Sequence, residues 1–310
     1  MNEMIDEKKK VMQDFFRDYG KLCAALLTLL LGFICCLSLS SSTSQASLKV
    51  SFLDIGQGDA ILIQTPNGHD MLIDGGPNDR ILEKLSEKMS YFDRHLDIIL
   101  ETHPDADHIT GLIPVLKKYD VSNIITSPIL GHTGIFDELE KHEQEERADM
   151  YIGERGDEII FGDGVQVRVL YPSKNFHGSS KATNDASVSV LVTYGEQSIL
   201  LTGDLPSEHE GEIVRELMRL EKSASVTQAP VTIYKAGHHG SKYSSGDKLL
   251  SYIQPNYTVI SAGKDNRYGH PNPEAVGRLE KYSHEILSTI DHGTVSFLLD
   301  GRHVKLDIDK

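Results

Sequence analysis

The alternation of apolar and polar positions divides the chain after residue 47 into short strand-like runs and amphipathic helical stretches. Leu96–Leu100 is apolar except for Asp97, as buried strands mostly are, and Val165–Tyr171 alternates with a period of two. Leu205–Leu220 repeats apolar residues at helical spacing. Strands open this region, and helices and strands then alternate. The pattern predicts an α/β fold of two sheets with helices on their outer faces.

One helical stretch, Asp137–Arg147, departs from the amphipathic pattern because it is strongly charged. We interpret it as an excursion into solvent. No strand is assigned between Arg147 and Val165.

An uncharged apolar run, Leu22–Leu39, precedes the α/β region. Its 18 residues reach the lower limit for a transmembrane helix and slightly exceed a signal-peptide core. The flanking basic residues lie on its N-terminal side, which predicts that this side stays in the cytoplasm. We therefore expect residues 1–47 to form a cytoplasmic stub, a hydrophobic signal or anchor segment and a Ser-rich tether. The domain at residues 48–310 is then anchored at the cell membrane facing outward or, after cleavage behind Ala46, secreted.

Charge and cysteine content exclude several function classes. Lys and Arg number 31 against 46 Asp and Glu, a net charge of −15. The basic and acidic residues before residue 48 balance, so the deficit lies on the domain. So acidic a domain is a poor non-specific DNA binder, although one local site can still hold nucleic acid. All 3 cysteines lie in the leader, which excludes a disulfide framework, a Cys-based zinc site and a thiol nucleophile in the domain.

Metal-ligating residue types gather in the segment Thr102–His108, directly after a predicted strand. In an extended chain, residues two apart point the same way, so His103 and Asp105 can hold one ion. Asp107 and His108, where the chain turns into a helix, can point at a second ion. The density of ligands outweighs the alternative in which Asp107 only caps the helix.

Two further predicted strands end in similar residues. Asp204 follows one of them, and its carboxylate can bridge two ions. His238 and His239 follow the other and supply at least one imidazole. Together the three loops predict two divalent ions that share an activated water or hydroxide.

This constellation resembles the metallo-β-lactamase superfamily, whose hallmark is His-x-His-x-Asp-His, with Asp105 standing where the second histidine would be. More specifically, the chain resembles the extracellular nuclease-like domain of the ComEC group of competence DNA-uptake proteins, from about residue 48 to 305. The matching motifs, in the family's order, are Asp54–Asp59, Leu72–Gly76, His103–His108, Asn184–Ser187, Thr202–Asp204, His238–Ser241 and Asn266–Pro271. The membrane channel of that group is absent from this sequence.

The resemblance implies an αββα four-layer sandwich with two metals at one edge. The metal ligands that it implies are His103, Asp105, Asp107, His108, Asp204 and His238, with His239 as the alternative to His238. The residues expected to support them from behind are Asp54, Asp74 and Asp185. The residues expected to contact substrate are Asn184, Ser241, Lys242 and Asn266, and those expected to take part in catalysis are Asp107, His239 and His270.

One departure concerns the third histidine of the family, because this chain has Asn184-Asp185 at that place. The first ion is then either weakly held or ligated by one of these two residues. The remaining set is rich in oxygen ligands, which moves the preference from zinc toward manganese and leaves both metals open.

Two adjacent ions suit phosphodiester hydrolysis because they clamp the attacking and leaving oxygens. Basic residues beside the motifs predict a rim for a phosphate-containing substrate, DNA among them. They are Lys235, Lys242, Lys264 and Arg267. The sequence therefore predicts a metal-dependent phosphodiesterase or nuclease. A non-catalytic metal-binding protein of the cell surface is the main alternative, a β-lactamase a lesser one, and no protein partner is inferred.

Overall fold

The computed structural model describes most of the domain and a few residues of the leader. The described residues are 4, 8, 12, 19–21, 27–29, 47–90, 92–173, 176, 182–223 and 231–308. The chain divides into two units, Met1–Ala46 and Ser47–Lys310. The apolar run Leu22–Leu39 and the Ser-rich tether lie largely outside the described residues. Among the helices that are described, none has the length and apolar character that crossing a membrane requires.

The second unit contains a mixed sheet of 8 strands in the order β15-β14-β1-β2-β3-β4-β5-β6. Its strands are β1 (Leu48–Phe52), β2 (Ile61–Gln64), β3 (Asp70–Ile73), β4 (His95–Leu100), β5 (Asp120–Thr126), β6 (Asp149–Ile152), β14 (Val295–Leu299) and β15 (Val304–Ile308). The four strands from β3 to β6 run parallel to one another. The first strand pairs with the last but one, with Leu48 opposite Leu299.

A second sheet of 7 strands has the order β13-β12-β11-β10-β9-β8-β7. Its strands are β7 (Glu158–Phe161), β8 (Val165–Tyr171), β9 (Ser189–Tyr194), β10 (Gln197–Leu201), β11 (Ile233–Lys235), β12 (Tyr257–Ile260) and β13 (Glu285–Ser288). The strands from β10 to β13 run parallel, and the others antiparallel.

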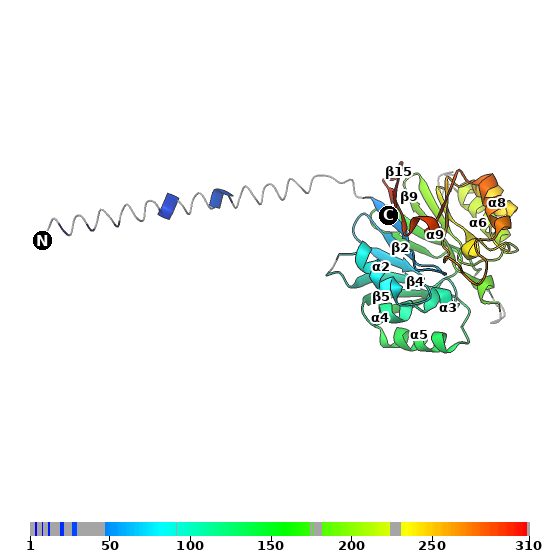
Figure 1. The fold of residues 1–310 in the computed structure, drawn as a ribbon, viewed down its shortest axis with the longest axis horizontal. Coiled ribbons are helices and arrows are strands. Elements are labelled where there is room, and N and C mark those ends of the chain that lie inside the picture. The colour runs from blue at the N-terminus through cyan, green and yellow to red at the C-terminus, as the bar shows by residue number, and fades with distance from the viewer. Residues whose placement is uncertain are drawn as a thin grey trace. The chain divides into compact units, whose positions relative to one another are not determined.

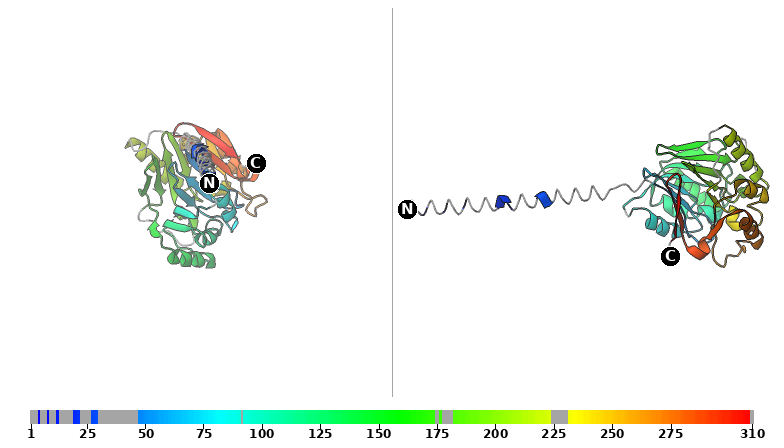
Figure 2. Two further views of the ribbon diagram at one scale, coloured as in Figure 1. Left: turned by 90° about the vertical axis from the view of Figure 1, so that its left-hand side faces the viewer. Right: turned by 90° about the horizontal axis from the view of Figure 1, so that it is seen from above.

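Helices cover the outer face of each sheet (Figures 1 and 2). Those on the first sheet are α2 (Arg80–Lys88), α3 (Ala106–Ile109), α4 (Leu112–Leu116) and α5 (Gly134–Glu145). Those on the second are α6 (Glu210–Lys222), α7 (Asp247–Ile253) and α8 (Pro273–Tyr282), and the short α9 (Thr289–His292) connects the sheets. The predicted αββα sandwich is confirmed.

The hydrophobic pattern of single strands explains this layering. Every residue of β10 is buried: Ile199 and Leu201 face the core between the sheets, and Leu200 faces the outer helices. A strand covered on both faces is mostly apolar along its length, whereas a half-covered one alternates. Full burial of such side chains stabilises the fold by about 1.5–3 kcal/mol each.

The structure corrects two expectations. Helix α5 overlaps the charged stretch Asp137–Arg147, but it is no excursion into solvent, because Phe136, Leu139 and Glu143 are buried. Strands β6 and β7 stand at sheet edges where no strand was expected. All four residues of β6 are exposed, so no burial pattern could mark it.

Gly111, between α3 and α4, tests how tightly the outer layer packs. A Cβ atom at this position would lie 1.9 Å from the carbonyl oxygen of Gly75. We expect Gly111→Ala to lower the free energy of unfolding by about 3 kcal/mol, because backbone must move to admit the methyl group. Urea denaturation measures this loss. The control is Gly277→Ala in α8, where nothing lies within 4 Å, and which should stabilise by about 0.5–1 kcal/mol. Equal effects of the two changes would contradict the prediction.

Candidate metal centre

The loop after β4 presents two fully buried histidines. His103 and His108 have 0% exposure, and their ring centroids lie 4.1 Å apart. Asp105 is the residue that precedes α3, and its side chain makes no cap hydrogen bond. Asp107 lies inside the first turn of α3 and so is not the cap residue. The loop therefore has side chains to offer to a ligand rather than to the helix.

A buried aspartate behind these histidines fixes their orientation. Asp74 follows β3, and its carboxylate accepts hydrogen bonds from the Thr102 backbone N–H at 2.8 Å, from Thr102 Oγ1 at 2.7 Å and from His108 Nδ1 at 2.7 Å. Since Nδ1 of His108 donates, Nε2 is the nitrogen that remains for a metal ion. Asp74 has a left-handed φ of 56°, which a residue with a side chain adopts only under local strain. Asp74, which the sequence predicted to support the metal ligands, thus contacts the metal loop directly.

The Thr102 hydroxyl orients the other histidine in the same way. Its one proton goes to Asp74, so it accepts from His103 Nδ1, which lies 2.9 Å away. This leaves His103 Nε2 as an acceptor. Burial and the neighbouring His108 imidazole lower the pKa of His103 to about 4. His103 is therefore neutral near pH 7, the form that binds metal ions.

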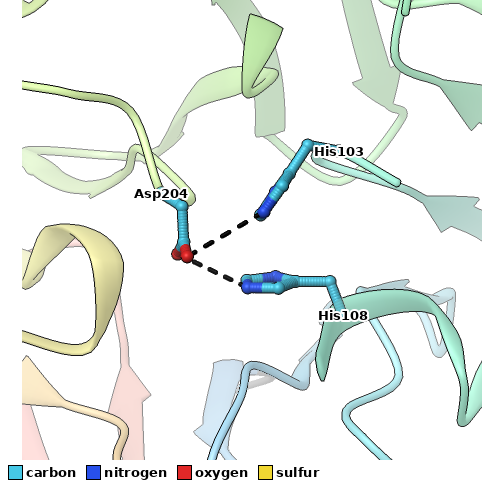
Figure 3. A group of neighbouring side chains, drawn as sticks. All are labelled: His103, His108 and Asp204. Atoms are coloured by element: carbon cyan, nitrogen blue, oxygen red, sulfur yellow. Dashed lines mark ion pairs between the residues drawn. The ribbon is translucent and has the colours of Figure 1, made fainter. Parts of the chain in front are cut away.

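Asp204, at the end of β10, meets these histidines from the other sheet. Its carboxylate lies 3.4 Å from His108 Nε2 and 3.9 Å from His103 Nε2, and Figure 3 shows the three side chains pointing toward one another. Burial opposes ionisation, but the His239, His108 and His238 imidazoles hold the pKa of Asp204 well below its usual range. Asp204 is therefore a buried anion at the centre of the cluster.

The two adjacent histidines after β11 lie differently. Both have left-handed φ values, 49° for His238 and 54° for His239. His239 is buried, its Nδ1 lies 3.1 Å from the Ser261 carbonyl, and its Nε2 lies 3.4 Å from both Asp107 and Asp204. The His238 side chain is 30% exposed, with Nε2 3.4 Å from Asp204. The geometry favours His239 for the ligand position that the sequence left open between the two.

Two overlapping trios offer ligand atoms within 4.8 Å of one another. One trio is His103, His108 and Asp204, and the other is Asp107, His108 and His239. The Nε2 atoms of all three histidines are buried without a hydrogen-bond partner. Buried polar atoms are rarely left unpaired, and several that face one point fit a cation. The donor set of imidazoles and carboxylates is one that zinc and manganese both accept.

Asp105 stands outside these trios. Its Oδ1 accepts a hydrogen bond from Thr183 Oγ1 at 2.6 Å, and its Oδ2 lies 3.8 Å from His103 Nε2. Thr183 and the predicted substrate residue Asn184 belong to a short 3-10 turn, Thr183–Ala186, where the third histidine of the family was expected. This turn therefore contacts the pair of His103 and Asp105 through the hydroxyl of Thr183 and not through a histidine.

Asp59 and Lys235 form a buried ion pair that the sequence did not reveal as part of the site. The two side chains are only 2% and 1% exposed, and Asp59 Oδ1 lies 3.3 Å from His239 Nδ1. The Asp59 N–H also donates to the Asp107 carbonyl at 3.3 Å. Asp59 is the last residue of the motif Asp54–Asp59, and its place in that motif was the sequence signal that could have identified it. Lys235 was expected on a phosphate-binding rim, and burial excludes it from that role.

Other predicted residues have local partners. Asp54 binds Arg80 at 3.0 Å, and Asp185 lies 3.4 Å from His209. The Asn266 side chain accepts from the Tyr268 and His270 N–H groups at 3.1 and 3.0 Å, so it shapes its own loop.

The three remaining residues differ in exposure. Ser241 is buried, and its hydroxyl accepts from Tyr243 N at 3.3 Å. Lys242 is exposed, with Nζ 5.0 Å above the Tyr243 ring. The ring of His270 lies 5.5 Å from that of His238, and its Nδ1 is buried without a partner.

The family model of the metallo-beta-lactamase superfamily matches residues 53–264, a span that contains the metal loop, Asp204 and both histidines after β11. The chain therefore belongs to the metallo-β-lactamase superfamily. Among solved structures, that of the metallo-beta-lactamase fold protein YhfI from Bacillus subtilis is similar, with a TM-score of 0.50 at 10% identity over 79% of this chain and 98% of that one. This likeness shows the shared fold.

Curated relatives carry the resemblance further. The chain is 28% identical to ComE operon protein 3 of Bacillus subtilis over 300 residues, which cover 91% of this chain and 36% of that protein. It is 29% identical to the competence protein ComA of Neisseria gonorrhoeae over 83% of this chain and 33% of that protein. The chain thus spans about a third of the length of these relatives. The predicted resemblance to the ComEC group is confirmed.

Replacing the carboxylate of Asp74 tests whether it positions the metal loop. We expect Asp74→Asn to weaken divalent metal binding by about 10–100-fold, because His108 loses the acceptor that fixes its orientation. Competition with a chromophoric chelator measures the affinity. Asp54→Asn is the matched control, since Asp54 is also an aspartate after a strand but pairs with Arg80. Equal affinities for Asp74→Asn and the unmodified protein would contradict this role.

Proposed function

We propose that this domain hydrolyses phosphodiester bonds with the help of two divalent cations, zinc or manganese. The observation that carries the proposal is the pair of overlapping ligand trios, joined at His108, beside a groove that contains Arg267. When bound, two such ions lower the pKa of water and offset the negative charge of a phosphate group.

The residues divide naturally between the two ions. Asp107, His108 and His239 would hold one. His103 and Asp105 would hold the other, and Asp204 would serve both ions, because its carboxylate is within 4 Å of His103, His108 and His239. The role of Asp74, Thr102 and Ser261 is to keep each Nδ1 occupied, so that each Nε2 would be left for the ions.

A groove beside Asp107 provides the place for substrate. It has a volume of about 470 Å³ and is lined among others by Asp107, Arg267 and Tyr268. The Arg267 guanidinium lies 4.8 Å above the Tyr268 ring, and both side chains are exposed. A basic group at a groove of a domain with net charge −15 favours an anionic substrate, which a phosphodiester such as DNA supplies.

The test is a metal-stripped and metal-replenished assay on three substrates: single-stranded DNA, bis-p-nitrophenyl phosphate and nitrocefin. We expect Mn²⁺ or Zn²⁺ to restore hydrolysis of the first two. Hydrolysis of nitrocefin alone would indicate a β-lactamase instead.

The shared ligand is tested by Asp204→Ala. We expect this variant to lose most of its metal and all activity, because Asp204 contacts the ligands of both ions. Elemental analysis and circular dichroism are measured together, with Asp54→Ala as the control that keeps both ions. Unchanged metal content in Asp204→Ala would overturn the shared site.

A second candidate function is metal binding without turnover. The observation in its favour is the turn Thr183–Ala186, which brings no histidine to the ligand pair of His103 and Asp105. The same assay separates the two, since tight binding of metal with no hydrolysis of any phosphodiester identifies the non-catalytic protein.

His270 is proposed to protonate the leaving oxygen or to bind a phosphate oxygen. It is not among the described ligand trios, yet its ring lies 5.5 Å from His238 at the same site. We expect His270→Ala to keep its metal and to lose about 10²–10⁴-fold in turnover of a dinucleotide. A p-nitrophenyl ester should suffer less, because its leaving group needs no proton. Loss of metal would make His270 a ligand, and normal rates on both substrates would make it structural.

We propose that the domain lies outside the cytoplasmic membrane, anchored by or cleaved from Leu22–Leu39. The uncharged run with basic residues only before it supports this orientation. Protease added to intact spheroplasts should digest an anchored domain, whereas a cytoplasmic marker enzyme stays intact. Complete protection of the cell-associated domain would reverse the orientation, and an N-terminus at Ser47 would indicate cleavage.

A further inference from the structure

An exposed aromatic side chain lines the groove beside the metal centre. Tyr268 is 51% exposed, and it shares this groove of about 470 Å³ with the candidate metal ligand Asp107. Pro77, Ala106 and Ile135 add apolar surface to the same groove. An open tyrosine ring in such a groove offers a flat apolar surface on which a planar group of a ligand can stack.

The loop that carries Tyr268 is fixed by one asparagine. The side-chain carbonyl of Asn266 accepts hydrogen bonds from the backbone N–H groups of Tyr268 and His270. Its amide group donates to the Gly263 carbonyl at 2.9 Å. The Tyr268 ring lies 6.1 Å from the His270 ring and is nearly parallel to it, at 14°. The ring is therefore held on the side of the site where His270 lies, and stacking on it requires little ordering of the protein.

Arg267 gives this ring a positively charged neighbour. Its guanidinium carbon lies 4.8 Å from the centroid of the Tyr268 ring, and its Nη2 donates to the Tyr268 hydroxyl at 2.6 Å. A guanidinium has five N–H donors, so this contact leaves others for a phosphate. The pair thus combines an open ring with a cation. Proteins hold single nucleic-acid strands with the same combination, because bases stack on aromatic rings while cations follow the backbone.

We propose that Tyr268 binds a nucleobase of the substrate by stacking, while Arg267 binds a phosphate next to that base. This inference rests on the proposed hydrolysis of phosphodiesters at the same site, and it narrows the substrate class to diesters that carry an accessible base. Phosphodiesters built on glycerol or on sugars alone offer no planar group to the ring. Every base has a π face, so we expect little preference for one base over another.

The test is competition binding to the metal-loaded full-length protein. A labelled octathymidylate is displaced by the same chain without label or by an unlabelled chain of equal length that lacks bases. All chains have phosphorothioate linkages, which resist hydrolysis. We expect the chain with bases to bind about 5–150-fold more tightly than the abasic chain, which is the gain that stacking one base on an aromatic ring confers.

Variants separate the ring from the charge. Tyr268→Ala should bring the ratio of the two affinities close to one, whereas Tyr268→Phe keeps the ring and should keep the ratio. Arg267→Ala should weaken both chains by a similar factor and should reduce the dependence of log affinity on log salt concentration by about one phosphate contact. Tyr151→Ala is the matched control, because Tyr151 is 53% exposed but lies on β6 and does not line the groove.

The outcomes distinguish this inference from the proposed hydrolysis. No binding of either chain, equal binding of both, or an undiminished ratio in Tyr268→Ala would overturn the stacking role, even where bis-p-nitrophenyl phosphate is hydrolysed. A preference for bases that disappears in Tyr268→Ala would support that role. The same preference in a protein that hydrolyses no phosphodiester would contradict the proposed hydrolysis and leave a site that binds nucleotides.

Discussion

The carboxylate of Asp74 is the contact on which the geometry of the metal centre depends. It lies at the end of β3 and holds both the backbone and the hydroxyl of Thr102 together with His108. These three hydrogen bonds to one buried carboxylate in turn fix which nitrogen of each imidazole remains free. The strained φ of Asp74 is maintained because these contacts and the surrounding packing over-determine it.

The two sheets contribute to the centre unequally. The first supplies the metal loop after β4 and its support, and the second supplies Asp204 after β10 and His239 after β11. The buried ion pair of Asp59 and Lys235 joins the two sheets. Asp59 lies between β1 and β2 of the first sheet, and Lys235 is the last residue of β11 in the second. Removing one partner of such a pair leaves a buried charge uncompensated, which makes this link costly to break. Ligand geometry therefore depends on how the sheets pack as much as on either loop.

The sequence predicted the elements that bury apolar residues and the loops that follow them, because both leave a periodic or dense pattern. It could not predict β6, whose exposed residues leave no period, or the burial of Glu143 on a helix that looked uniformly charged. Nor could it choose between His238 and His239, which differ only in how the strained turn directs each ring. The burial of Lys235 depends on Asp59, which lies 176 residues away, so no local pattern distinguished it from a surface lysine.

The pairing of β1 with β14 sets the order in which the domain can assemble. Leu48 opens the domain and its partner Leu299 lies far along the sequence, so a ribosome must synthesise everything from Leu48 to Leu299 before these two strands can pair. Contacts so distant in sequence make folding slow, because a long loop must be ordered before they form. During that interval β1 lacks a neighbour on one side, and an unpaired strand is prone to wrong pairing.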